Sequence, residues 1–340
     1  MNEDGFWDNQ EKAQKVISKF KLVKGQIDPL DDVSGRLEDA QVGLELAKEA
    51  DDTELLEEAD VLMENFRPGV MTRCGLDYAS IKERFPRLVY CSVSAYGETG
   101  SLSDRPGFDP VLQAESGLMS MTGEADGPPL RHPVSIIDIM TALHSVGAIL
   151  AALWARRDTG TGQHIELALM DVAVAALSNA GQSFLMSGEQ LPRAGNSHPL
   201  STPTNLFSAS DGDLYMACAS NRLFGKFCRE VIDRPDLPDD PRFKTTSDRF
   251  DNRPELFEIL NGIFATKTRA EWLVKMRHLP AGALQNFEEA LNSEIVKERG
   301  MVTTVEHPQA GPIKVLGSPL NFSDTPIRAF TAAPLLGADT

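Results

Sequence analysis

The stretch that most constrains the fold of this chain runs from Thr159 to Asp171, with the sequence TGTGQHIELALMD. Gly160 and Gly162 predict a tight turn. The apolar residues from Ile165 to Leu169 predict a β-strand that leads to Asp171, and the small apolar residues after it predict a helix. A carboxylate at the carboxyl end of a strand, where the next helix begins, lies where open α/β sheets bind their ligands.

Two interpretations of Asp171 follow from this position. An ionised carboxylate held near free backbone N–H groups could attack an acyl carbon as a nucleophile. Alternatively, Asp171 serves only as the N-cap of its helix, a common role for aspartate. Position alone favours the N-cap interpretation, because aspartate is so common at that position.

The charge of the chain limits its partners. The 340 residues carry a formal net charge of −17, which argues against nucleic-acid binding. Residues 1–60 hold 17 Asp and Glu against 7 Lys and Arg, so the N-terminal segment differs chemically from the rest. Overall composition is that of a soluble globular protein long enough for two domains.

Cysteine spacing and hydropathy predict the compartment. The four cysteines show no CxxC pair, so we expect free thiols in a reducing environment and no metal site. The acidic N-terminus does not resemble a signal peptide. The apolar run from Ile136 to Trp154 is interrupted by polar residues and predicts a buried helix rather than a membrane span. A cytoplasmic location without membrane association is therefore expected.

Segment 1–59 carries a heptad pattern. Apolar residues recur every seven positions, and further apolar residues fill some of the interleaved positions. The recurring residues are Val16, Val23, Leu30, Leu37 and Leu44, with Phe20 and Ile27 between them. Asp28 and Pro29 interrupt the pattern. Aspartate is typical of the N-cap and proline of the first position of a helix, so this pair indicates the start of a second helix. We expect an acidic helical hairpin or coiled coil over 1–59.

From residue 60 onward, predicted strands alternate with helices, which indicates a parallel α/β sheet. We expect this Rossmann-like large domain to span 60–190. A stretch rich in Pro, Ser and Asn then leads into a smaller α+β domain over 200–305. Residues 306–340 are expected to return to the large domain.

The region from about residue 60 to 326 resembles the class III CoA-transferase family, which includes formyl-CoA transferase and α-methylacyl-CoA racemase. The likeness rests on the order of its motifs over about four fifths of the chain. These motifs are Asp60–Gly69 (DVLMENFRPG), Arg87–Gly97 (RLVYCSVSAYG), Arg105–Asp109 (RPGFD), Thr159–Gln163 with Met170–Asp171, Ser210–Gly212, Pro280–Gly282, Gly300–Met301, Gly317–Pro319 and Thr325–Pro326.

The resemblance favours the nucleophile interpretation of Asp171. In this family, the matching aspartate attacks an acyl-CoA thioester, forms a mixed anhydride and then an aspartyl-CoA thioester, and passes CoA to an acceptor acid. The expected partners are therefore an acyl-CoA and a carboxylic acid, with the CoA thioester as substrate and no permanently bound cofactor. The resemblance also implies an interlocked homodimer.

The same resemblance assigns CoA contacts to the loop after the first predicted strand. Asn65, Phe66 and Arg73 fall at CoA-contacting positions of the family. Arg67 lies in the same loop, where a guanidinium suits a phosphate. A structural Arg67 that bonds the loop backbone is an equal alternative.

One motif distinguishes activities within the family. Racemases carry a histidine before the aspartate of a Gly-His-Asp motif, whereas this chain has Phe108 between Gly107 and Asp109. Because phenylalanine cannot transfer a proton, the motif favours CoA transfer over racemase or epimerase chemistry.

The N-terminal segment resembles a different family. Gly5–Gln14 (GFWDNQEKAQ) and Gly43–Asp52 (GLELAKEADD) are similar to the N-terminal helical domain of bacterial peptide chain release factor 2, over about residues 1–58. The Gly-Gly-Gln tripeptide of release factors is missing, so no translation function is inferred. We expect a chimera in which a helical hairpin precedes a CoA-transferase domain truncated at its N-terminus. A non-catalytic remnant of the fold is the rival to an active enzyme.

Overall fold

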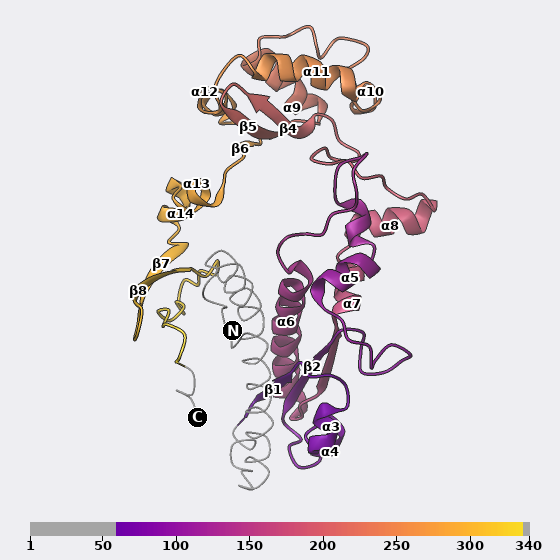
Figure 1. Ribbon diagram of the computed structural model, residues 1–340, viewed down its shortest axis with the longest axis vertical. Coiled ribbons are helices and arrows are strands. Elements are labelled where there is room, and N and C mark those ends of the chain that lie inside the picture. The colour runs from indigo at the N-terminus through magenta and orange to yellow at the C-terminus, as the bar shows by residue number, and fades with distance from the viewer. Residues whose placement is uncertain (1–58, 336–340) are drawn as a thin grey trace, which may run out of the picture. The chain divides into compact units, whose positions relative to one another are not determined.

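The computed structural model describes residues 59–335, so the predicted hairpin over 1–59 lies almost wholly outside the described residues. The chain divides into two units, 1–193 and 194–340. Figure 1 shows the order of the elements along the chain. Each unit is described by itself below.

The described part of the first unit, residues 59–193, is built on three parallel strands in the order β1–β2–β3. Its elements are β1 (Val61–Glu64), α3 (Val70–Cys74), α4 (Tyr78–Ile81), β2 (Val89–Ser94), α5 (Asp109–Glu115), the 3-10 turn η2 (Leu118–Met121), α6 (Ile136–Thr159), β3 (His164–Ala168), α7 (Leu169–Ala175) and α8 (Ser178–Ser187). The alternation of strands and helices confirms the predicted parallel α/β sheet. The prediction that it is Rossmann-like remains a prediction.

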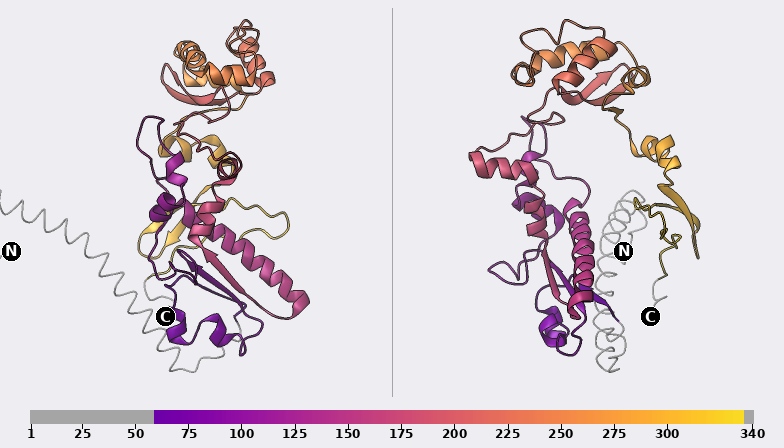
Figure 2. Two further views of the ribbon diagram at one scale, coloured as in Figure 1. Left: turned by 90° about the vertical axis from the view of Figure 1, so that its right-hand side faces the viewer. Right: turned by 180° about the vertical axis from the view of Figure 1, so that it is seen from behind.

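The central strand β2 is buried on both faces, as expected for a parallel sheet covered by helices. On one face, Tyr90 joins a cluster of apolar side chains that includes Met71 from α3 and Ile81 from α4. On the other face, the Cys91 thiol meets Ser145 of α6, and burial raises its pKa. Figure 2 shows α6 running along this sheet. The sheet is therefore sandwiched between α6 and the short helices α3 and α4.

Helix α6 is 24 residues long and is apolar enough to cross a membrane by length and composition. A core helix of a soluble protein passes the same test. Its inner face packs on the sheet through Ile137, Thr141, Ser145 and Ala152, which are all buried. The expectation of a buried helix is wrong for the opposite face, because apolar side chains there remain exposed.

The glycine turn before β3 is fixed by two different constraints. Gly160 ends α6 in the left-handed region, with φ 76°, and its N–H donates to the Arg156 carbonyl at 2.8 Å. A Cβ on Gly162 would lie only 2.0 Å from the carbonyl oxygen of Leu88. The second glycine is therefore required by the close approach of two backbones, which sets where β3 enters the sheet.

The second unit contains a three-stranded antiparallel sheet in the order β4–β5–β6, and a separate hairpin of β7 and β8. Its elements are β4 (Thr204–Ala209), β5 (Gly212–Ala217), α9 (Asn221–Lys226), the π-helical turn η3 (Phe227–Val231), α10 (Thr246–Asp251), α11 (Arg253–Phe264), α12 (Arg269–Met276), β6 (Ala281–Ala283), α13 (Phe287–Leu291), α14 (Glu294–Glu298), β7 (Val302–His307) and β8 (Gly311–Leu316).

The core of the second unit is aromatic. Phe264 stacks between Phe207 and Phe227, at ring-centroid distances of 5.1 and 5.9 Å, and Trp272 packs edge-on at 5.2 Å. Beside this core, the fully buried Arg249 donates hydrogen bonds to the carbonyls of Thr202, Phe243 and Ala219. Burial lowers the pKa of its guanidinium.

The close approach at Gly162 yields a first prediction. Gly162→Ala should lower the free energy of unfolding by about 1–3 kcal/mol, because the added methyl group forces two backbones apart. Urea denaturation of the full chain measures this loss. Gly262→Ala in α11 is the control, since a Cβ there meets no atom within 4 Å. An unchanged midpoint for Gly162→Ala would contradict the packing described here.

Candidate active site

A cavity of about 740 Å³ lies at the carboxyl ends of β1 and β2, the edge at which parallel sheets bind ligands. Four stretches of chain and α6 contribute its walls. The lining residues are Met63 and Glu64 of β1 with Asn65 after it; Val93 and Ser94 of β2 with Ala95 after it; Gly107 and Phe108; Asp138, Thr141, Ala142 and Ser145 of α6; and Leu169 at the start of α7.

The wall formed by Phe108 is held in place by the residue after it. Asp109 is 3% exposed, and its Oδ2 accepts hydrogen bonds from the backbone N–H groups of Ile137, at 2.6 Å, and Asp138, at 3.3 Å. Its other oxygen accepts from the Gln113 amide at 2.6 Å. A buried carboxylate from another part of the chain thereby satisfies the free N–H groups at the start of α6.

Asp171 lies in the first turn of α7, just beyond the cavity wall. The strand before it ends at Ala168, so the expectation that the strand runs to Leu169 is wrong by one residue. Ala168 occupies the N-cap position, which means that Asp171 is not the cap of this helix. The Met170 N–H donates to the Ala95 carbonyl at 3.0 Å and ties this turn to the end of β2.

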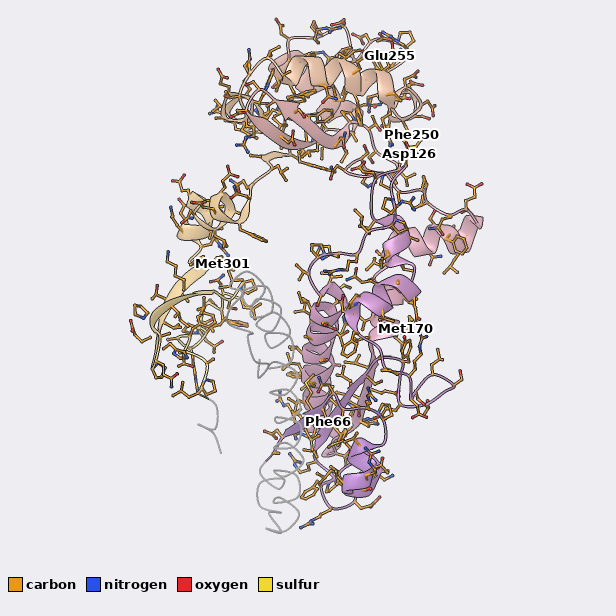
Figure 3. All side chains as sticks on the ribbon, viewed as in Figure 1. Phe66, Asp126, Met170, Phe250, Glu255 and Met301 are labelled. Carbon is orange, nitrogen blue, oxygen red and sulfur yellow. The ribbon has the colours of Figure 1, made fainter. Side chains whose placement is uncertain are left out.

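The Asp171 side chain is exposed, and it is absent from the described residues that line the cavity. Leu169, two positions earlier in the chain, does line it. Figure 3 labels the adjacent Met170 and, on the loop after β1, Phe66. The structure therefore places Asp171 beside the cavity rather than in its wall.

The predicted CoA-binding residues are distributed over two cavities. Asn65 lines the large one, whereas Phe66 and Arg67 line a second, of about 30 Å³, and all three side chains are exposed. Glu64 borders both cavities and accepts a hydrogen bond from the Phe66 N–H at 2.8 Å, which sets the loop's direction. Arg73 lies in α3 with an exposed side chain and, among residues 59–335, is outside both linings.

Two carboxyl groups of the cavity were not predicted from sequence. Burial raises the pKa of Glu64, and the neighbouring Glu98 raises it further. Burial also raises the pKa of Asp138, with a contribution from the nearby negative charge of Asp109. The sequence offered one signal for Asp138: it is an acidic residue inside an apolar helical run.

On the sheet face away from α6, the Ser92 hydroxyl lies 2.8 Å from Nε2 of His164, and Glu98 lies 3.6 Å from the same nitrogen. This Ser–His–Glu group does not form a relay, because both partners meet one ring nitrogen. Ser92 is 1% exposed and so closed to substrate. Tyr78 stacks on His164 at 5.1 Å, which indicates a packing role for the histidine.

Among the described residues, no group of three or more His, Cys, Asp or Glu side chains is arranged to hold a metal ion. The site's chemistry is thus that of carboxylates, amides and backbone N–H groups at the end of a parallel sheet. Such a site suits acyl transfer to or from a carboxylate.

Comparison with known proteins identifies the family. The model of CoA-transferase family III matches residues 40–340, and the chain belongs to this family. An acyl-CoA transferase from Fusarium pseudograminearum is 38% identical over 291 residues, which are 84% of this chain and 64% of that protein. Human succinyl-CoA:glutarate CoA-transferase is 35% identical over 289 residues, 84% of this chain and 66% of the human protein.

Comparison with solved structures supports the same family. The crystal structure of a CAIB/BAIF family protein from Brucella suis matches with a TM-score of 0.73 and 36% identity, covering 84% of this chain and 74% of that one. The chain spans slightly less than two thirds of the length of the two curated relatives above.

The buried carboxylate at the start of α6 gives a second prediction. Asp109→Asn should lower the free energy of unfolding by about 2 kcal/mol, because a neutral amide replaces the charge that faces the helix N–H groups. Urea denaturation at pH 7 measures this change. Asp126→Asn, at an exposed loop position, is the control. Equal midpoints for the two variants would contradict the role given to Asp109.

The raised pKa of Glu64 gives a third prediction. A carboxyl group whose pKa is higher in the folded chain stabilises the fold below its ordinary pKa of about 4.5, and this stabilisation is lost as pH rises through the folded pKa. The stability of Glu64→Gln relative to wild type should therefore increase between pH 4 and pH 7. Denaturation midpoints across this range test the sign, and a decrease would refute it.

Proposed function

We propose that this chain is an acyl-CoA:carboxylate CoA-transferase with Asp171 as its nucleophile. The observation that carries the proposal is that Asp171, at the family's motif position, lies in the first turn of α7, directly after β3 and beside the cavity at the carboxyl edge of the sheet. Exposure leaves the Asp171 carboxylate accessible to a substrate. Asp171 is not the N-cap of α7, and its place in the first turn puts the carboxylate near the positive end of the helix dipole, which favours the ionised form that a nucleophile needs.

The proposed reaction proceeds through covalent intermediates. The Asp171 carboxylate attacks the thioester carbonyl, the C–S bond breaks, and a mixed anhydride forms with release of the CoA thiolate. The thiolate then attacks the Asp171 acyl carbon, which frees the donor acid and leaves an aspartyl-CoA thioester. An acceptor carboxylate repeats these steps in reverse and departs as the new acyl-CoA. Acyl activation is thereby kept in covalent bonds and protected from hydrolysis.

The loop after β1 is the proposed position of CoA. Asn65 faces the large cavity, and Phe66 and Arg67 border the small one next to it, so a ligand along this loop contacts all three. Arg73, one helix further on, would contribute positive charge from outside the two cavities. A thioester held here would extend its acyl group into the large cavity.

The walls of the large cavity suit a small polar acyl group. Asn65, Ser94, Thr141 and Ser145 line the cavity with amide and hydroxyl groups, which can donate hydrogen bonds to a carboxylate. The human relative's name pairs succinyl-CoA with glutarate, two dicarboxylic acyl groups. We propose short dicarboxylic acids as the donor and acceptor class.

A fourth prediction tests the nucleophile. Incubation with succinyl-CoA followed by intact-protein mass spectrometry should show a covalent adduct that hydroxylamine removes and that maps to Asp171. Asp171→Ala should lose the adduct and reduce transfer to glutarate by about 1,000-fold or more, with CoA binding by calorimetry retained. Asp126→Ala is the matched control, since its carboxylate is exposed in a loop.

The outcomes distinguish the rival functions. Full transfer by Asp171→Ala would refute the mechanism. A folded wild-type chain that binds no CoA and shows neither adduct nor transfer would favour the non-catalytic alternative. Exchange of the α-hydrogen of an acyl-CoA with deuterated water would favour a racemase or epimerase, for which Phe108 offers no proton-transfer group.

A further inference from the structure

Four polar side chains on the sheet face away from α6 contact one another in series. Ser92 of β2 is the register partner of Glu64 of β1, and its hydroxyl hydrogen-bonds to the Glu64 carboxylate. The same hydroxyl lies 2.8 Å from Nε2 of His164 on β3. Glu98, from the loop after β2, lies 3.6 Å from that nitrogen. We refer to these four residues as the polar network, which crosses all three strands of the sheet.

The direction of the hydrogen bonds in the polar network follows from the number of protons available. A serine hydroxyl has one proton, and an ionised carboxylate only accepts. If Ser92 donated to a bare nitrogen of His164, the Glu64 carboxylate would face serine lone pairs, and the Glu98 carboxylate would face the bare nitrogen. Both arrangements are repulsive. Nε2 of His164 therefore carries a proton and donates it to Ser92, and the Ser92 proton points to Glu64.

The imidazole of His164 is held in one orientation by its neighbours. Tyr78 stacks on the ring at a centroid distance of 5.1 Å, and Tyr90 meets it edge-on at 5.5 Å. The backbone at Glu98 is fixed as well, because Oε1 of Glu166 accepts the Glu98 N–H at 2.6 Å. In addition to its packing, the histidine thus presents its Nε2 to a fixed set of partners.

The other end of the polar network reaches the loop after β1. Oε2 of Glu64 accepts the Phe66 N–H at 2.8 Å and so fixes the direction in which the loop leaves the strand. A carboxylate held by both the Phe66 N–H and the Ser92 hydroxyl has fewer orientations than one held by the N–H alone. The order of the loop therefore depends on side chains of β2 and β3.

We propose that Ser92 and His164 are positioning residues for the loop of residues 65–67. The His164 N–H orients the Ser92 hydroxyl, the hydroxyl orients the Glu64 carboxylate, and the carboxylate holds the Phe66 N–H. The benefit of this order to CoA binding rests on the proposed function, whereas the order itself does not. The polar network differs from a catalytic relay, because its protons are held in place rather than transferred.

The proton on His164 provides the first test, with the full wild-type chain at pH 8. In histidine-selective ¹⁵N spectra, the signal that is absent from His164→Gln should show a proton on Nε2. If that variant unfolds, nuclear Overhauser contacts to the Tyr78 ring assign the signal instead. A proton on Nδ1 alone would overturn the proposal, because Ser92 would then have no donor. This measurement requires no CoA.

Two substitutions of His164 separate hydrogen bonding from packing. His164→Phe keeps an aromatic ring against Tyr78 and removes the donor, whereas His164→Gln keeps an N–H donor and removes the ring. Amide hydrogen exchange at Phe66 should be about three- to tenfold faster in His164→Phe and in Ser92→Ala, and close to wild type in His164→Gln. Unchanged exchange in Ser92→Ala, or the opposite order for the two His164 variants, would overturn the proposal.

His278→Gln is the matched control. Nε2 of His278 also faces a carboxylate, that of Glu230 at 3.3 Å, but does so in the second unit. Exchange at Phe66 in this variant should equal that of wild type, and urea midpoints report whether each variant remains folded. Faster exchange at Phe66 in the control would contradict a specific role for the polar network.

Kinetics with succinyl-CoA separate this proposal from the proposed function. Ser92→Ala and His164→Phe should raise KM for the CoA donor about three- to tenfold and change kcat by less than about twofold. Faster exchange at Phe66 with an unchanged KM would refute the proposed position of CoA and support the positioning of the loop. If the wild-type chain transfers no CoA, the proposed function fails, and the proton on His164 and the exchange at Phe66 still decide this proposal.

Discussion

The contact on which the candidate site most depends is the buried carboxylate of Asp109 against the first N–H groups of α6. It joins two parts of the cavity wall, the Phe108 loop and the start of α6 that carries Asp138, and it is held by Gln113 of α5. A helix start buried without such a partner is costly, because several backbone donors remain unsatisfied. The Asp109 side chain therefore holds the start of α6 against the loop that carries Phe108.

A second constraint fixes the opposite end of the same helix. Gly160 ends α6, and Gly162 passes so close to the Leu88 carbonyl that no side chain fits between them. Together with the Arg156–Asp60 contact, this turn aligns β1, β2 and β3 in one sheet. The carboxyl edge that results holds the CoA-transferase motifs at neighbouring strand ends, which is how segments distant in sequence come to border one cavity.

Helix α6 links the sheet to the cavity. Its inner face packs on the sheet through Ile137, Thr141, Ser145 and Ala152. Thr141 and Ser145 also line the cavity, together with Asp138 and Ala142 of the same helix. The packing that stabilises the sheet and the shape of the cavity therefore depend on the same helix.

Much of the fold follows from the sequence alone. Apolar periodicity predicted the parallel sheet and α6, because the hydrophobic pattern and the turn residues that define these elements act locally. The order of the motifs along the chain separately indicated the CoA-transferase family. Tertiary structure alone decided the rest. It excluded Asp171 as an N-cap, assigned Asp109 to a helix start 28 residues away, and brought Glu64 and Asp138 to one cavity. It also showed that α6 is buried on only one face. These features depend on contacts between distant segments and on the burial of charge, neither of which is encoded in local spacing.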